Sequence, residues 1–126
     1  LQKVPSSSKG LLLLGKIYQE SGKIELSEET YKKIQGGGIN SAKAYNNLGI
    51  LFIKQKKYEK ARNAFNASIN FYPKISDAHY NLGKLILDSK GDTNLARRHL
   101  EFALAYNRSP YLKQEIDRLI EEMLSP

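Results

Sequence analysis

A leucine-glycine pair recurs at a constant interval along this chain. The pairs Leu14-Gly15, Leu48-Gly49 and Leu82-Gly83 are each 34 residues apart. Glycine costs about 1 kcal/mol relative to alanine inside a helix, so its recurrence at one period needs a structural reason. Self-similarity at a fixed period of this size indicates a stacked array of one supersecondary unit.

Each of the three units has the pattern of a helical hairpin. In the second unit, apolar residues at helical spacing predict a helix over about residues 42–55. A polar turn at residues 56–57 and a second periodic stretch that stops before Pro73 complete the pair. The first and third units repeat this arrangement, with turns at residues 21–23 and around residues 91–92.

The turn of the third unit is one residue longer than the other two. Gly83 and Ala96 are 13 positions apart, whereas Gly49 and Ala61 are 12 apart. Loops absorb such an insertion at little cost, so we expect the extra residue near residues 89–90.

The end of the chain predicts a single helix over about residues 110–124. Ser109 is a suitable N-cap and Pro110 fits the first turn. The residues of its apolar stripe are Leu112, Ile116, Leu119, Ile120 and Met123. Asp117 lies one period after Gly83, with no glycine nearby. We therefore expect a capping helix with a polar outer face.

The second unit carries a family resemblance. Tyr45-x2-Leu48-Gly49-x2-Phe52, followed by Ala61-x3-Phe65 and Pro73, resembles the tetratricopeptide repeat in order and spacing. The resemblance implies an all-α fold, a right-handed α-solenoid of three helical hairpins with a C-terminal capping helix. It divides the chain into a flexible segment 1–7 and a domain 8–126, with repeats at about 8–41, 42–75 and 76–109. The outer repeats depart from the pattern at Leu11, Ser27, Ile39, His79, Ile86 and Leu100.

In each hairpin, the first helix has a second face that does not carry the apolar residues of the core. The resemblance implies that these faces line a concave groove for a ligand. We call its candidate ligand-binding positions the groove residues. They are Leu12, Lys16, Asn46, Asn47, Ile50, Ile53, Lys54, Tyr80, Asn81, Lys84 and Leu87. Asn47 and Asn81 stand at equivalent places, and an amide offers a donor and an acceptor to a ligand main chain. For Asn46 a solvated or capping amide remains an alternative, and for the apolar members partial burial against a neighbouring helix does.

Charge and composition limit the kinds of partner and chemistry that we expect. Twenty Lys plus Arg against 13 Asp plus Glu give a net charge of +7, which favours acidic partners. The absence of cysteine excludes disulfides and thiolate chemistry. The apolar run 11–14 is far shorter than the ~20 residues that cross a bilayer. We expect a soluble chain, cytoplasmic or, if a targeting segment was removed, periplasmic or otherwise extracytoplasmic.

One subclass of the family binds acidic chaperone C-termini through a clamp of Lys, Asn, Asn, Lys and Arg on this face. The matching places here hold Leu12, Lys16, Asn47, Asp77 and Asn81. Only Asn47 agrees, and Asp77 inverts the charge. A chaperone cofactor of that type is not expected.

The sequence favours a non-enzymatic scaffold that binds an extended peptide or a helix of another protein, acidic or amphipathic, with self-association as a further option. No constellation of catalytic groups converges, and no cofactor or metal site is expected. His79 takes a core position and His99 stands alone. One alternative is nucleic-acid binding through the basic surface around residues 54–60. Another is an accessory domain of a larger enzyme.

Overall fold

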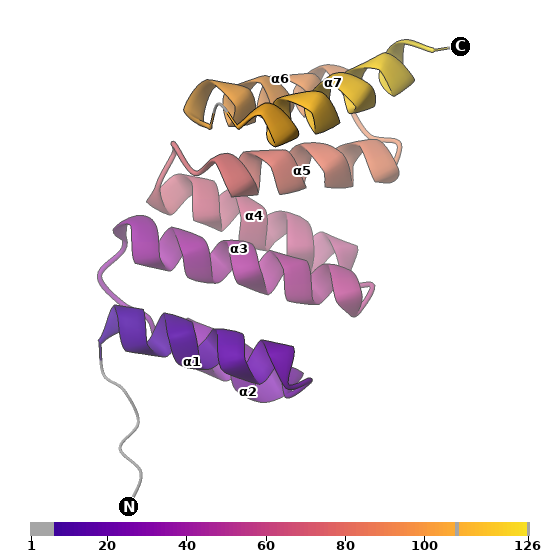
Figure 1. Cartoon of the computed structure of the whole chain (residues 1–126). Helices are drawn as coiled ribbons and strands as arrows, with labels where there is room; N and C mark the ends of the chain where they lie inside the picture. Colours follow the sequence, from indigo (N-terminus) through magenta and orange to yellow (C-terminus); the bar gives the residue numbers. More distant parts are fainter. Residues whose placement is uncertain (1–6, 108, 126) are drawn as a thin grey trace, which may run out of the picture. The chain divides into compact units, whose positions relative to one another are not determined.

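The computed structural model describes residues 7–107 and 109–125, and within these ranges it contains seven α-helices and no strand (Figure 1). The helices are α1 (Ser8–Glu20), α2 (Ile24–Lys32), α3 (Gly38–Lys54), α4 (Tyr58–Phe71), α5 (Ser76–Asp88), α6 (Thr93–Tyr106) and α7 (Pro110–Leu124). The predicted all-α class, its three hairpins and its last helix are confirmed. Of the segment expected to be flexible, residues 1–6 lie outside the described residues. Ser7 is the N-cap of α1, and its Oγ accepts a hydrogen bond from the Gly10 amide at 3.1 Å.

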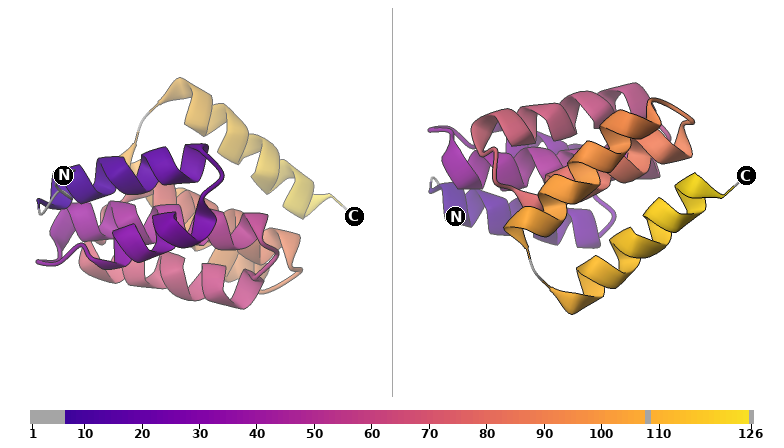
Figure 2. Two further views of the ribbon diagram at one scale, coloured as in Figure 1. Left: turned by 90° about the horizontal axis from the view of Figure 1, so that it is seen from below. Right: turned by 90° about the horizontal axis from the view of Figure 1, so that it is seen from above.

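The chain divides into two compact units between Pro73 and Lys74. In the first unit, α1 pairs with α2 and α3 pairs with α4, while α3 also packs against both helices of the first hairpin. In the second unit, α5 pairs with α6 and α7 packs against α6. Figure 2 shows α7 running beside α6 in the opposite direction.

The recurring glycines lie where the two helices of each hairpin approach each other. A Cβ added at Gly15 would lie 2.6 Å from Cδ1 of Tyr31, and one at Gly49 would lie 2.6 Å from Cδ1 of Phe65. Real Cβ atoms do not approach other atoms so closely, so the aromatic ring occupies the space that a side chain would need. This contact is the structural reason for the glycine in the first two hairpins.

Buried serines join the helices at two places in the first unit. The Ser27 hydroxyl donates to the Gly15 carbonyl at 2.7 Å, and the Ser68 hydroxyl donates to the Ala42 carbonyl at 2.6 Å. Both serines have no exposed surface, so these bonds satisfy groups that would otherwise be costly to bury. Ser27, a departure from the repeat pattern, is therefore accommodated by a specific bond.

The turns match the predicted lengths. Within each of the first two hairpins, the turn between the helices has three residues, at 21–23 and at 55–57. The turn of the third hairpin has four residues, at 89–92, so the extra residue lies at the predicted place. Each turn contains one residue in the left-handed region: Gly22 at φ 77°, Lys56 at φ 61° and Lys90 at φ 56°.

Candidate functional site

The first unit presents seven of the groove residues, two on α1 and five on α3. Lys16 and Lys54 are exposed, whereas Leu12, Ile50 and Ile53 are partly exposed. Accessible apolar side chains on a protein surface are typical of places where another molecule binds. Asn46 differs, because only 6% of it is exposed, and this excludes the solvated alternative for its amide.

The Asn47 amide lies at the junction of the first hairpin and α3. Its Nδ2 donates to the Tyr31 hydroxyl on α2 at 3.4 Å, and that hydroxyl donates to Oε1 of Gln19 on α1 at 2.9 Å. Burial raises the pKa of Tyr31, because a phenolate would be poorly solvated there. Asn47 therefore already has a bond within the unit. The sequence did not predict this contact. Its only signal was the 34-residue repeat, which predicts that successive hairpins pack against each other.

The second unit presents the other four groove residues, all on α5. Tyr80 and Leu87 pack against a buried cluster formed by α6 and α7, whose members are Leu100, Ala103, Ile116 and Leu119. Burial raises the pKa of Tyr80, and the negative charge of Glu115 on α7 adds to this effect. Asn81 is partly exposed and Lys84 is exposed. Two of the four groove residues on α5 are thus partly covered by the cluster that α6 and α7 form.

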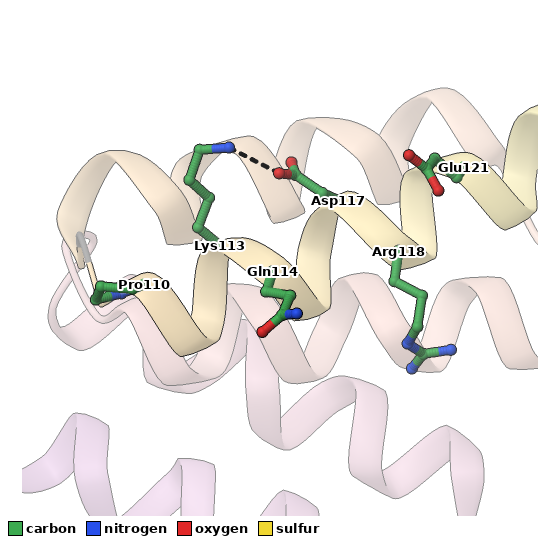
Figure 3. Close-up of a pocket in the computed structure, with 6 residues that line it drawn as sticks. All are labelled: Pro110, Lys113, Gln114, Asp117, Arg118 and Glu121. Carbon is green, nitrogen blue, oxygen red and sulfur yellow. Dashed lines mark hydrogen bonds and ion pairs between the residues drawn. The ribbon is translucent and has the colours of Figure 1, made fainter.

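The outer surface of α7 carries a hollow of about 470 Å³ lined by Pro110, Lys113, Gln114, Asp117, Arg118 and Glu121 (Figure 3). None of these is a groove residue. Lys113 Nζ donates to Oδ2 of Asp117 at 2.7 Å. Arg118 pairs with Glu115 and Glu122, and the hydrogen bond from Arg118 lowers the pKa of Glu115. These charges are paired within the helix at i,i+3 and i,i+4, which stabilises α7 slightly.

The two histidines of the third hairpin lie against each other. His79 is buried, as predicted, and its Nδ1 lies 3.0 Å from Nδ1 of His99. The prediction that His99 stands alone is wrong, because the α5–α6 hairpin places residues 20 positions apart opposite each other. Among residues 7–107 and 109–125, no group of three side chains suited to hold a metal ion occurs. No helix in these ranges is long and apolar enough to span a bilayer.

Comparison with known proteins identifies the repeat. Residues 8–35 and residues 42–75 each match the tetratricopeptide repeat. The Type IV pilus assembly protein PilF of Pseudomonas aeruginosa is 31% identical over 107 residues, which are 83% of this chain and 42% of PilF. The chain therefore spans less than half the length of this relative.

Solved structures have the same architecture. The structure of Pseudomonas aeruginosa PilF matches with a TM-score of 0.71 at 26% identity. The match covers 94% of this chain and 55% of the PilF chain. The first tetratricopeptide domain of Spaghetti (RPAP3), bound to the HSP90 peptide SRMEEVD, has a TM-score of 0.73 at 17% identity and covers 97% of this chain and 98% of its own. The second likeness concerns the fold alone. With two matched repeats and three hairpins of the same design, the chain belongs to the tetratricopeptide-repeat family.

Proposed function

We propose that this chain is a non-enzymatic scaffold that binds an extended peptide or a helix of another protein through its groove residues. Tetratricopeptide-repeat domains are protein–protein interaction modules, and the chain belongs to that family. The observation that carries the proposal is the mixed surface of the first unit. There, the accessible apolar side chains Ile50 and Ile53 lie on the same helix as Asn47 and the exposed Lys54.

The partner segment is proposed to be acidic or amphipathic. Lys16, Lys54 and Lys84 are exposed members of the groove residues, and the whole chain has a net charge of +7. Charged residues at the edge of a binding surface mainly raise the association rate and exclude wrong partners, whereas apolar contacts supply most of the affinity. The segment should therefore combine carboxylates with apolar side chains.

The test begins with a pull-down from the source organism, followed by calorimetric titration of the isolated partner segment. The double variant Lys16→Glu and Lys54→Glu should weaken binding about fivefold to thirtyfold, if each exposed charge contributes up to about 1 kcal/mol. The matched control, Lys23→Glu with Lys33→Glu, changes two exposed lysines outside the groove residues by the same net charge. Equal weakening by both pairs would mean that only the overall charge matters, and the groove proposal would then be wrong.

Asparagine variants test the amide contribution separately. Asn47→Ala with Asn81→Ala should weaken binding about twenty-five-fold, if each ligand bond contributes on the order of 1 kcal/mol. Asn66→Ala with Asn70→Ala, which removes two exposed amides from α4, is the control and should leave affinity unchanged. The peptide SRMEEVD should not bind, because Leu12 and Asp77 replace cations of the acidic-peptide clamp.

A further inference from the structure

The third hairpin contains two histidines whose rings meet at the same kind of atom. Nδ1 of His79 on α5 lies 3.0 Å from Nδ1 of His99 on α6. The ring centroids are 5.2 Å apart, and the ring planes differ by 31°. Because the centroids are farther apart than the nitrogens by about the width of one ring, both nitrogens lie close to the line between the ring centres. This is the arrangement of an N–H···N hydrogen bond, and we call the two residues the histidine pair.

The histidine pair can hold at most one positive charge while this contact is closed. One Nδ1 must donate its N–H, and the other must accept with its lone pair. Two neutral rings satisfy this requirement, and so does one protonated ring beside a neutral one. When both rings are protonated, both Nδ1 atoms carry a hydrogen, and two like charges face each other across 3.0 Å. The contact must then open.

Aromatic rings of α6 lie against the histidine pair. The ring centroid of His79 is 5.3 Å from that of Phe102 and 6.1 Å from that of Tyr106. Phenylalanine does not titrate, and a phenol is neutral where histidine titrates. His79 is only 5% exposed, and burial disfavours the charged form of an imidazole. Burial therefore adds to the cost of a second proton.

Charged residues do not occupy the positions one helical turn from either histidine. The residues three and four positions before and after His79 and His99 are all uncharged. The charged residues nearest to them along the chain are Asp77, Arg97, Arg98 and Glu101. Arg97 is partly exposed and the other three are exposed. On α7, which packs against α6, the residues at the shared buried cluster are apolar, and the charges at positions 113, 115, 117, 118 and 122 pair with one another. Within residues 75–103, no carboxylate one turn away on the same helix therefore balances a second positive charge.

We propose that the histidine pair is a pH-sensitive contact that holds α5 against α6 at neutral pH and opens when both rings are protonated. In an unfolded chain, each histidine takes up a proton at about pH 6.5. Below this pH the unfolded chain binds two protons at these positions, whereas the closed pair binds at most one. Because the unfolded state binds more protons, the stability of the third hairpin falls as the pH decreases below about 6.5.

A titration of the whole chain tests this proposal without any substitution. The chain has two histidines, so the Cε1–H signals of their rings can be followed individually by NMR. Between about pH 8 and pH 5, we expect the two rings together to take up at most one proton while α5 and α6 stay folded. The second proton should be taken up only together with the loss of the folded amide signals of α5 and α6. Two independent titrations at about pH 6.5, with both helices intact, would overturn the proposal.

Two variants measure the same difference as a change in stability. In His99→Gln the amide can accept a hydrogen bond from His79 but cannot be protonated. His79→Phe keeps a ring beside Phe102 and Tyr106 and removes the pair from the other side. In urea denaturation between about pH 6 and pH 5, the unfolding equilibrium constant of the original chain should increase up to about tenfold more per pH unit than that of either variant. All three chains have the same carboxylates, so an equal pH dependence in the three would contradict the proposal.

Discussion

The glycines at positions 15, 49 and 83 occupy one place in three hairpins, yet their surroundings differ. At Gly49 an added Cβ would meet the ring of Phe65, which is fully buried. At Gly83 it would lie 3.0 Å from Leu100 side-chain atoms and 3.1 Å from the Ala96 carbonyl oxygen. The first contact is more severe than the second.

We therefore predict that Gly49→Ala lowers the free energy of unfolding by about 1–3 kcal/mol through overpacking. Gly83→Ala should cost less, because its contacts at 3.0–3.1 Å need smaller shifts than those at Gly49 and alanine gains about 1 kcal/mol in helix propensity. Urea denaturation of the two variants measures the difference. Equal losses would contradict the idea that the aromatic ring sets the penalty.

The turn residues lead to a stabilising prediction. Lys56 has φ 61°, in the left-handed region where the first hairpin uses Gly22. Lys56→Gly removes a Cβ clash worth about 1–2 kcal/mol and adds chain entropy to the unfolded state, so the net gain should be a few tenths to about 1 kcal/mol. Lys57→Gly, at φ −97°, gains nothing from glycine and should destabilise the protein. Thermal melts of both variants check the sign, and a lower melting temperature for Lys56→Gly would contradict it.

At the scale of helices, α7 completes the core of the second unit. Ile116 is 0% exposed and Leu119 is 7% exposed, both packed with Leu100 and Ala103. A terminal repeat needs such a cover, with a polar outer surface, to remain monomeric.

Deleting residues 110–126 should expose this cluster and cause association or a broader, less cooperative melt. The milder variant Ile116→Ala should cost about 2–5 kcal/mol by leaving a cavity. Tyr111→Ala is the control, because Tyr111 is 78% exposed on the same helix. A truncated protein that stays monomeric with an unchanged melting temperature would show that α7 is dispensable.

Helices and turns could be predicted because their signals are local. The helical spacing of apolar residues around Leu48 and Gly49 predicted α3. The interval of 13 positions from Gly83 to Ala96 located the longer turn. The candidate site was less accessible to this reasoning, because side chains from different helices meet in space rather than along the chain. The bond from Asn47 to Tyr31 and the packing of Tyr80 against the cluster with α7 depend on such meetings. The ligand role of the groove residues stays a prediction.

At the scale of the whole molecule, the net charge of +7 raises the question of whether the chain binds nucleic acid. The exposed lysines at 54, 56, 57 and 60 cluster near the α3–α4 turn, but Lys60 lies over the Phe52 ring at 5.8 Å and Tyr58 is a single exposed aromatic in that segment. Binding of single strands usually needs several aromatic platforms along a basic path.

We predict no saturable binding of generic RNA or DNA at physiological ionic strength, about 0.15 M. A fluorescence-anisotropy titration at increasing salt measures this. Tight binding that persists at this ionic strength would favour the nucleic-acid alternative, whereas weak binding confined to dilute buffer reflects only the net charge.

The hydroxyl of Tyr31 has a consequence for how the first unit opens. One oxygen links three successive helices, because it donates to Gln19 of α1, belongs to α2 and accepts from Asn47 of α3. Local opening in proteins occurs in roughly contiguous cooperative units, which often coincide with supersecondary motifs. The short α2, only nine residues long, could not hold its backbone bonds closed by itself. The backbone amides of α2 should therefore exchange with deuterium at rates similar to those of α3. The two hairpins of the first unit would then open together as one cooperative unit.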